Sequence, residues 1–218
     1  MMNKCFPNGA KKCVTFSFDD GSLEDIRLSE LFKKYNVKCT FNISDALLKI
    51  KGEDFEECYS GHEIACHGAE HKKLTEITDG EIIKEIKVNK DNLENLVQYN
   101  VSGYAYAGGY HNDHSIEVLK KCGIAYARTT INTGEFGFPT DFMRWNPTCH
   151  YKSANDYVDD FLNNNDNSLK LFYIWGHSYE FKTEDDWNLF EELLKKLTKH
   201  KNIWFTTNIE VYNFINNK

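Results

Sequence analysis

The sequence predicts an α/β fold in which helices cover a parallel sheet. Short runs of β-branched and aromatic residues alternate with segments of helical periodicity about seven times along the chain. Polar residues with catalytic chemistry directly follow several of the predicted strands, and active sites of parallel-sheet proteins collect at these strand ends. A closed barrel and an open doubly wound sheet both fit this pattern. We expect residues 1–218 to form one domain, since single α/β domains routinely reach this length.

The first three predicted strands lie in the first third of the chain. Residues 14–18 alternate and are rich in β-branched and aromatic residues, as in a buried strand, and an Asp-Asp-Gly-Ser turn leads from them into a helix over 23–35. The apolar run 38–43 predicts the second strand, followed by a short helix over 45–50. Residues 62–67 predict the third strand.

The middle of the chain continues the alternation. Residues 78–98 form one long amphipathic helix, which opens with a Thr and a Glu at capping-box spacing. A strand over 104–107 runs into a Gly-Gly pair. A helix over 115–122 ends at a glycine, and a strand over 124–128 follows.

The last third contains one irregular region and then regular elements. Residues 130–152 have no clear period and carry several Gly and Pro residues, so we expect a long functional loop whose aromatic side chains cover a pocket. The remaining elements are a helix over 155–164, a strand over 169–174, a helix over 183–198, a strand over 203–207 and a helix over 209–215.

The composition is that of an ordered globular protein with an acidic surface. Hydrophobic residues make up 41% of the chain, enough for a sizeable core, and the formal net charge is -7. A continuous basic surface for nucleic acid is therefore not expected, and a small molecule or an oligosaccharide fits better as a partner. The seven cysteines have no regular spacing, which favours reduced thiols.

The chain contains no evident targeting segment. Its N-terminal residues lack the apolar run of a secretory signal. No later stretch approaches the roughly 18 apolar residues of a membrane span. These features predict a cytoplasmic protein that does not insert into a membrane.

Asp and His side chains follow the first and third predicted strands. Asp20 comes just after the first strand, and His67 ends the third, with His71 four residues later. One carboxylate oxygen and two imidazole nitrogens suit one divalent ion, with Zn²⁺ preferred and Co²⁺, Ni²⁺ or Mn²⁺ as alternatives. Three protein ligands leave a position for water, whose pKa a bound metal can lower to about 7.

Asp19 and His177 are the candidates for proton transfer. Successive side chains of a strand diverge, so Asp19 is not expected to share the ion with Asp20 and is the candidate general base. His177 follows the strand over 169–174 and is available to protonate a leaving amine, with Asp185 or Asp186 as candidates to orient it. Each feature alone is common in ordinary turns and strand ends. Their combination indicates a catalytic site more specifically than any one of them does.

These residues resemble the NodB-homology polysaccharide deacetylases of carbohydrate esterase family 4. Residues 15–21 (TFSFDDG) are similar to the family's first motif, in which the first Asp is the base and the second binds metal. Residues 67–71 (HGAEH) are similar to its second motif, His-Ser/Thr-x-x-His, with Gly68 in place of the hydroxyl residue, so a supporting hydrogen bond is expected to be lost. The resemblance extends over about residues 12–214 and implies a distorted (β/α)₇ barrel of the glycoside hydrolase/deacetylase type.

The other family motifs are matched only in part. Residues 105–110 (AYAGGY) are closest to a Tyr-Pro-Tyr-Gly form of the third motif and lack its Arg, which orients the catalytic Asp in the family. Either Arg128 or Arg144 is then expected to supply that charge. Arg144-Trp145 is the best match to the fourth, groove-lining motif, and residues 174–177 (IWGH) match the fifth, Leu-x-His.

The resemblance also implies residues that bind the substrate. A backbone N–H near Gly108 corresponds to the family's oxyanion donor, and aromatic faces at the strand ends suit sugar rings. The substrate-binding candidates are Tyr106, Gly108, Tyr110, Arg144, Trp145 and Trp175.

We therefore expect hydrolysis of an N-acetyl group on an amino-sugar-containing oligosaccharide or polysaccharide, by attack of metal-bound water. One alternative is a hydrolase of another linear or cyclic amide on the same fold, favoured by the missing Arg and the missing export signal. A second is a catalytically weak carbohydrate-binding protein. The five intact Asp and His residues argue against a pure binder, which has no chemical need for them.

Overall fold

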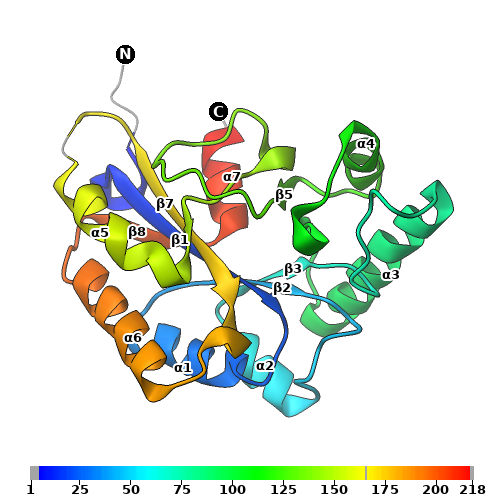
Figure 1. Ribbon diagram of the computed structural model, residues 1–218, viewed down its shortest axis with the longest axis horizontal. Helices are drawn as coiled ribbons and strands as arrows, with labels where there is room; N and C mark the ends of the chain where they lie inside the picture. Colours follow the sequence, from blue (N-terminus) through cyan, green and yellow to red (C-terminus); the bar gives the residue numbers. More distant parts are fainter. Residues whose placement is uncertain (1–4, 165, 217–218) are drawn as a thin grey trace.

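The strands form a parallel sheet that curls into a barrel, with the helices outside it (Figure 1). The computed structural model describes residues 5–164 and 166–216. In that part of the chain the sheet has eight strands in the order β5-β4-β3-β2-β1-β7-β6, with β8 paired to β1. The strands are β1 (Lys12–Asp20), β2 (Thr40–Ile43), β3 (Glu63–Cys66), β4 (Gly103–Ala105), β5 (Tyr126–Arg128), β6 (Cys149–His150), β7 (Lys170–His177) and β8 (Ile203–Thr206).

Backbone pairing closes the sheet into a distorted barrel. β1 pairs with β7 along most of its length, with β8 at its amino-terminal half and with β2 at its carboxyl-terminal half. At the far edge, Arg128 of β5 forms a parallel bridge with Trp145, and the chain from Trp145 reaches β7 through β6. A short irregular segment therefore completes the ring. This architecture confirms the distorted (β/α)₇ barrel expected from the sequence.

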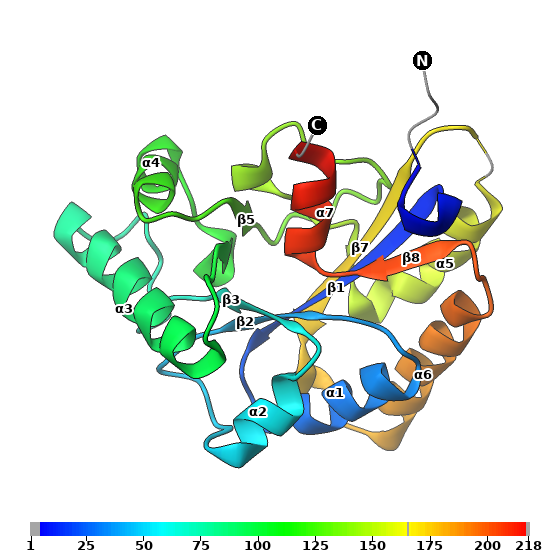
Figure 2. The same ribbon diagram turned by 180° about the vertical axis from the view of Figure 1, so that it is seen from behind.

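Most of the helices lie outside the barrel in two groups (Figures 1 and 2). Figures 1 and 2 show α1, α5 and α6 on one side of β1, and α3 beside α4 on the other. The helices are α1 (Asp25–Lys34), α2 (Glu53–Tyr59), α3 (Asp79–Val97), α4 (Asp113–Lys121), α5 (Ala154–Asn163), α6 (Glu184–Thr198) and α7 (Asn208–Asn216). Short 3₁₀ turns are η1 (Pro7–Gly9), η2 (Ala107–Gly109), η3 (Phe142–Arg144), η4 (Tyr151–Ser153) and η5 (Ser178–Glu180). No helix among the described residues has the length and apolar character to cross a membrane.

The predicted helix over 45–50 is wrong. The structure has turns there, and the next helix is α2, which the sequence did not predict. The backbone N–H groups of Leu47 and Leu48 both bond to the Ser44 carbonyl, and the Lys49 N–H bonds to the carbonyl of Gly21. That contact with the end of β1 prevents the segment from continuing as a helix.

β1 separates an apolar layer from a polar barrel interior. On one face, Phe16 packs against Phe32 of α1 and Phe190 of α6. On the other face, Ser17 accepts a hydrogen bond of 2.8 Å from the Asn42 amide of β2. This alternation, with period two, directs Asp19 into the interior as well.

Candidate active site

The carboxyl ends of the strands bring the five Asp and His candidates together. Asp19 and Asp20 are the last residues of β1, and His177 is the last residue of β7. Asp19 and His177 are register partners across this strand pair. His67 directly follows β3, and His71 lies in the same loop.

Asp20, His67 and His71 direct three ligand atoms toward a common point. His67 Nε2 lies 3.4 Å from Asp20 Oδ1 and 3.0 Å from His71 Nε2. Asp20 Oδ1 lies 3.7 Å from His71 Nε2. Ligand atoms of a tetrahedral zinc ion, each about 2.0–2.1 Å from the metal, lie about 3.4 Å apart. The observed separations lie on both sides of that value.

Hydrogen bonding orients His67 toward the common point but does not occupy Asp20 Oδ1. His67 Nδ1 lies 2.8 Å from the Ala105 carbonyl oxygen, which only accepts, so Nδ1 carries the proton and Nε2 keeps its lone pair. Asp20 Oδ1 is buried and has no hydrogen-bond partner among the described residues. Such an oxygen is unfavourable unless a cation binds it. The three residues therefore fit a divalent metal ion.

Two of the three candidate ligands have a left-handed backbone. The φ angle is 86° at Asp20 and 56° at His71. Non-glycine residues rarely adopt such values, and this strain is found mostly at functional sites. The surrounding contacts must hold both residues in these conformations.

Side chains of α3 support the loop that carries the two histidines. Asn89 Oδ1 accepts bonds of 3.0 Å from the backbone N–H groups of His67 and Gly68. Glu85 Oε1 accepts bonds of 2.9 Å from the two residues that flank His71. A Cβ at Gly68, whose φ is +88°, would meet Glu85 Oε1 at 2.5 Å. Gly68 itself offers no side-chain hydrogen bond, and Glu85 and Asn89 hold the loop instead.

Buried side chains fix both carboxylate oxygens of Asp19. The Asn42 amide donates a bond of 2.8 Å to Oδ1, and the Arg128 guanidinium donates to Oδ2. The same Oδ2 lies 3.8 Å from His67 Nε2 and 3.9 Å from His177 Nε2. Burial raises the pKa of Asp19, but nearby positive charge, above all that of Arg128, outweighs burial and lowers the pKa below its usual range. Asp19 is therefore an ionised carboxylate.

Arg128 supplies the charge that the third motif lacks. It ends β5, is wholly buried, and its guanidinium lies 4.7 Å from the centre of the Trp175 ring. Arg144 instead pairs with Asp141 and Asp113 at the surface. Of the two arginines that the sequence left open, the structure brings Arg128 to Asp19.

A carboxylate three residues after His177 faces its other ring nitrogen. Glu180 Oε1 lies 3.7 Å from His177 Nδ1. Asp186, one of the residues expected beside His177, instead accepts hydrogen bonds from Lys182 and Thr183 at the cap of α6.

Two aromatic residues expected to bind substrate are buried in the core. Tyr106 is 0% and Trp145 1% exposed. The Tyr106 hydroxyl donates a bond of 2.9 Å to the Met143 carbonyl. Trp145 packs edge-on against Tyr126 and Tyr173. The expectation that these two rings present faces to a sugar therefore does not hold.

The other substrate candidates lie nearer the surface. Tyr110 is 48% exposed, whereas Trp175 is 8% exposed and donates its indole N–H to Asn132 over 2.8 Å. Gly108 is exposed, with a φ of 60° inside η2. Arg144 lines a surface hollow of about 400 Å³ formed by the long loop.

Sequence reasoning missed several side chains that support the site. They are Asn42, Glu85, Asn89 and Glu180. Asn42 carried a signal, because a lone amide in a buried strand requires a hydrogen-bond partner. Glu85 and Asn89 are four residues apart among the buried residues of α3, so they share its inner face. The pattern does not say which loop that face meets.

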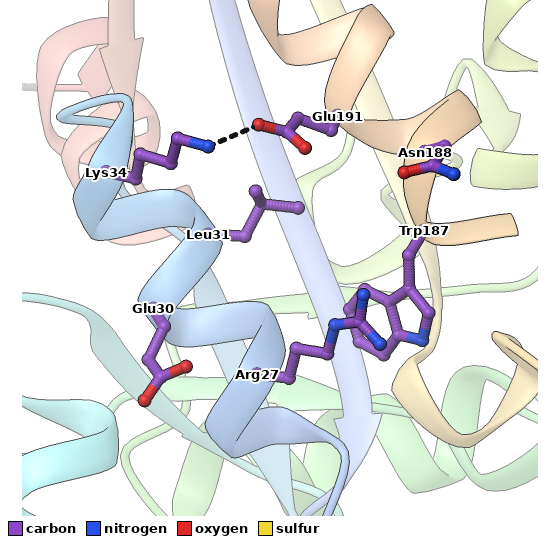
Figure 3. A pocket seen from close by; sticks show the side chains of 7 residues that line it. All are labelled: Arg27, Glu30, Leu31, Lys34, Trp187, Asn188 and Glu191. Carbon is purple, nitrogen blue, oxygen red and sulfur yellow. Dashed lines mark hydrogen bonds and ion pairs between the residues drawn. The ribbon is translucent and has the colours of Figure 1, made fainter. Parts of the chain in front are cut away.

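A hollow between α1 and α6 is separate from this site (Figure 3). The Lys34 ammonium lies 2.6 Å from a Glu191 oxygen, and the Arg27 guanidinium lies 4.5 Å from the centre of the Trp187 ring. Arg27 also pairs with Glu184 at 2.6 Å. The basic side chains of this hollow are thus paired, and none of the catalytic candidates lines it.

Comparison with known proteins identifies the family. The model of the polysaccharide deacetylase family matches residues 7–127, which is more than half of the chain. The chain therefore belongs to the polysaccharide deacetylase family, and the resemblance to NodB-homology proteins is confirmed. No curated protein sequence matches the chain.

Solved structures share the fold. Deacetylase PplD from Streptococcus pyogenes is 24% identical with a TM-score of 0.59, over 63% of this chain and 64% of PplD, so the match spans less than two thirds of that protein. Peptidoglycan deacetylase PdaC from Bacillus subtilis is 19% identical with a TM-score of 0.65, over 97% of this chain and 94% of PdaC. PuuE allantoinase is 12% identical with a TM-score of 0.77, over 96% of this chain and 91% of the allantoinase.

Proposed function

We propose that this chain is a metal-dependent deacetylase that hydrolyses the N-acetyl group of an amino-sugar-containing oligosaccharide or polysaccharide. One observation carries the proposal. Ligand atoms of Asp20, His67 and His71 lie within 4.8 Å of one another, and the buried Asp19 carboxylate lies 3.8 Å from one of them. We also propose that residues 1–218 act as one catalytic domain, since strands from both halves of the chain line the site.

Asp20, His67 and His71 are the proposed ligands of one divalent ion, with Zn²⁺ preferred because of the donor set. When bound, such an ion supplies Lewis acidity that polarises the amide carbonyl and activates water. The chain holds the donors ready for it, through the fixed tautomer of His67 and the constrained backbone of the other two ligands.

Asp19 and His177 are the proposed base and acid. Asp19 Oδ2 takes a proton from the attacking water while Arg128 keeps the carboxylate in place. His177 Nε2 gives a proton to the amide nitrogen as the C–N bond breaks, which releases acetate and a free amine. Proton exchange with solvent then restores both groups. Glu180, facing His177 Nδ1, is a positioning residue for the ring.

The proposed oxyanion donor is the backbone N–H near Gly108. A Cβ at Gly109 would meet Thr130 Oγ1 at 2.3 Å, so only glycine allows the backbone of η2 to pass so close to the next loop. We propose Tyr110 and Trp175 as the nearest aromatic contacts of the substrate, and Arg144 as a contact further out.

A second candidate function is hydrolysis of a smaller linear or cyclic amide. The observation that favours it is the burial of Tyr106 and Trp145, which leaves Tyr110 as the one well-exposed ring among the predicted sugar contacts. A small amide needs no row of aromatic faces, whereas a polysaccharide chain is commonly held by them.

A substrate screen on zinc-loaded protein separates the two candidates. We expect acetate release from N-acetylated chitooligosaccharides, measured by an enzyme-coupled acetate assay. An Asp20→Ala variant that lacks the tightly bound metal is the matched control. Turnover of simple or cyclic amides without any acetate release would favour the second candidate.

A further inference from the structure

A second group of metal-binding side chains lies beside the proposed acid. His150 ends β6, His177 ends β7 and Glu180 ends η5. One ligand atom from each of these residues lies within 4.8 Å of the other two. The group shares no residue with the triad of Asp20, His67 and His71.

Two atoms of this group are buried and form no hydrogen bond within the described part of the chain. They are His177 Nδ1 and Glu180 Oε2. Glu180 Oε2 lies 2.8 Å from His150 Nε2, yet the two do not meet hydrogen-bond geometry. A buried carboxylate oxygen without a hydrogen bond keeps its lone pairs available to a cation.

The chemistry of the donors suits a first-row divalent cation. Two imidazole nitrogens and one carboxylate oxygen form a known ligand set for zinc. The backbone N–H of Lys152 donates only a long bond of 3.4 Å to His150 Nδ1, so it fixes the ring tautomer weakly.

One neighbouring charge competes with a cation at this position. The Lys152 ammonium lies 3.6 Å from Glu180 Oε2, and the lysine side chain is 56% exposed. It is free to move into solvent when a cation binds. The competition makes this site weaker than the triad at Asp20.

We propose that His150, His177 and Glu180 form a second, weaker site for a divalent cation such as Zn²⁺, and that filling it inhibits the enzyme. An ion on His177 Nδ1 excludes a proton from that nitrogen. The ring then cannot become the doubly protonated acid that gives its Nε2 proton to a leaving amine. The inhibitory effect rests on the role proposed for His177, whereas the site itself does not.

Zinc stoichiometry tests the site without any activity measurement. Equilibrium dialysis at rising free zinc, with metal quantified in the protein, is expected to give two zinc ions per wild-type chain and one, weakly bound, in Asp20→Ala. The double variant Asp20→Ala/His150→Ala is expected to bind none. His114→Ala, which removes a surface histidine paired with Asp79, is the control and should keep both.

This experiment distinguishes failure of the second site from failure of the proposed metal ligand Asp20. Complete loss of zinc in Asp20→Ala would overturn the second site and leave the first assignment intact. Two zinc ions in Asp20→Ala would contradict Asp20 as a ligand. The test of the second site would then be whether His150→Ala removes one of the two zinc ions.

Two further variants test the inhibition. Excess zinc is expected to lower wild-type turnover about tenfold relative to one equivalent, and to change the turnover of His150→Ala less than about twofold. Lys152→Ala is expected to bind the weaker zinc several-fold more tightly, because a competing positive charge is removed. Equal inhibition of wild type and His150→Ala, or unchanged zinc affinity in Lys152→Ala, would overturn the proposal.

Discussion

The Asp19 carboxylate has a buried countercharge, and this determines its chemistry. Arg128 is wholly buried and contacts Asp19 from β5, while the Asn42 amide holds the other oxygen from β2. A buried charge without its partner is costly, so the pair keeps the carboxylate ionised and in one orientation. A general base needs both properties.

Removing either proposed proton-transfer group should abolish turnover. We expect Asp19→Asn and His177→Ala each to lower kcat by about 10²–10⁴-fold, since each removes one proton transfer. The chain should still fold and bind its tight zinc, because neither residue is a ligand of that site. Acetate release, zinc content and circular dichroism check this. Near-normal rates in either variant would show that acid and base were misassigned.

Arg128 should not tolerate the change to lysine. Its guanidinium contacts Asp19 and stacks on Trp175, and an ammonium cannot do both. We expect Arg128→Lys to lower kcat by about 10–100-fold with a smaller effect on KM. Arg27→Lys, at the separate hollow between α1 and α6, is the matched control. Wild-type kcat in Arg128→Lys would mean that Asp19 is oriented by other contacts.

At the scale of elements, α3 connects the outer layer to the metal triad. Glu85 and Asn89 reach from this helix to the backbone on both sides of the ligand histidines. Gly68 leaves the space that the Glu85 carboxylate occupies. Helix and loop are therefore one unit, and a change in either should disturb both.

A methyl group at position 68 should damage this unit. Gly68→Ala places a Cβ 2.5 Å from Glu85 Oε1 at a φ of +88°. We expect a loss of about 1–3 kcal/mol in the free energy of unfolding and weaker zinc binding. Urea denaturation and zinc titration measure these effects.

Gly80→Ala in the first turn of α3 is the control. A Cβ there meets no atom within 4 Å, so this variant should be neutral or stabilised by about 0.5–1 kcal/mol. Equal stability of the two variants would contradict the packing argument.

The local sequence pattern located most helices and strands. It failed where contacts with distant parts of the chain determine the local structure. The capping box formed by Thr78 and Glu81 is present at the start of α3, as predicted. The segment 45–50 has helical composition but is held by a hydrogen bond to Gly21. β6 is only two residues long and lies in the predicted loop, so it had no period to detect.

At the scale of the whole molecule, a buried carboxyl group closes the amino-terminal end of the barrel. Glu63, at the start of β3, accepts hydrogen bonds from the Thr40 hydroxyl, the Tyr126 hydroxyl and the backbone N–H of Ile209 in α7. Burial raises the pKa of Glu63 to about 7, although these bonds oppose the shift. Four elements therefore meet at one group that titrates near neutral pH.

This group should make stability depend on pH. The folded chain holds the Glu63 proton up to about pH 7, whereas the unfolded chain releases it near its usual value of 4.5. The free energy of unfolding should therefore fall as pH rises between these values, by up to about 3 kcal/mol, and level off above pH 7. Urea denaturation of wild type and Glu63→Gln at pH 5 and pH 8 measures the contribution. The stability advantage of wild type over the variant should shrink with pH, and a constant difference would contradict the raised pKa.

The sequence by itself determined the fold class, the barrel and the five Asp and His residues of the proposed site. Strand periodicity predicted the fold class, the resemblance to the family's motifs implied the barrel, and the rule that strand ends share one edge grouped the five residues. Only the tertiary structure decided that Arg128 rather than Arg144 meets Asp19, that Glu85 and Asn89 compensate for Gly68, and that Tyr106 and Trp145 are core residues. These outcomes depend on how side chains from distant parts of the chain pack in the same space. Such packing cannot be inferred from a local sequence pattern.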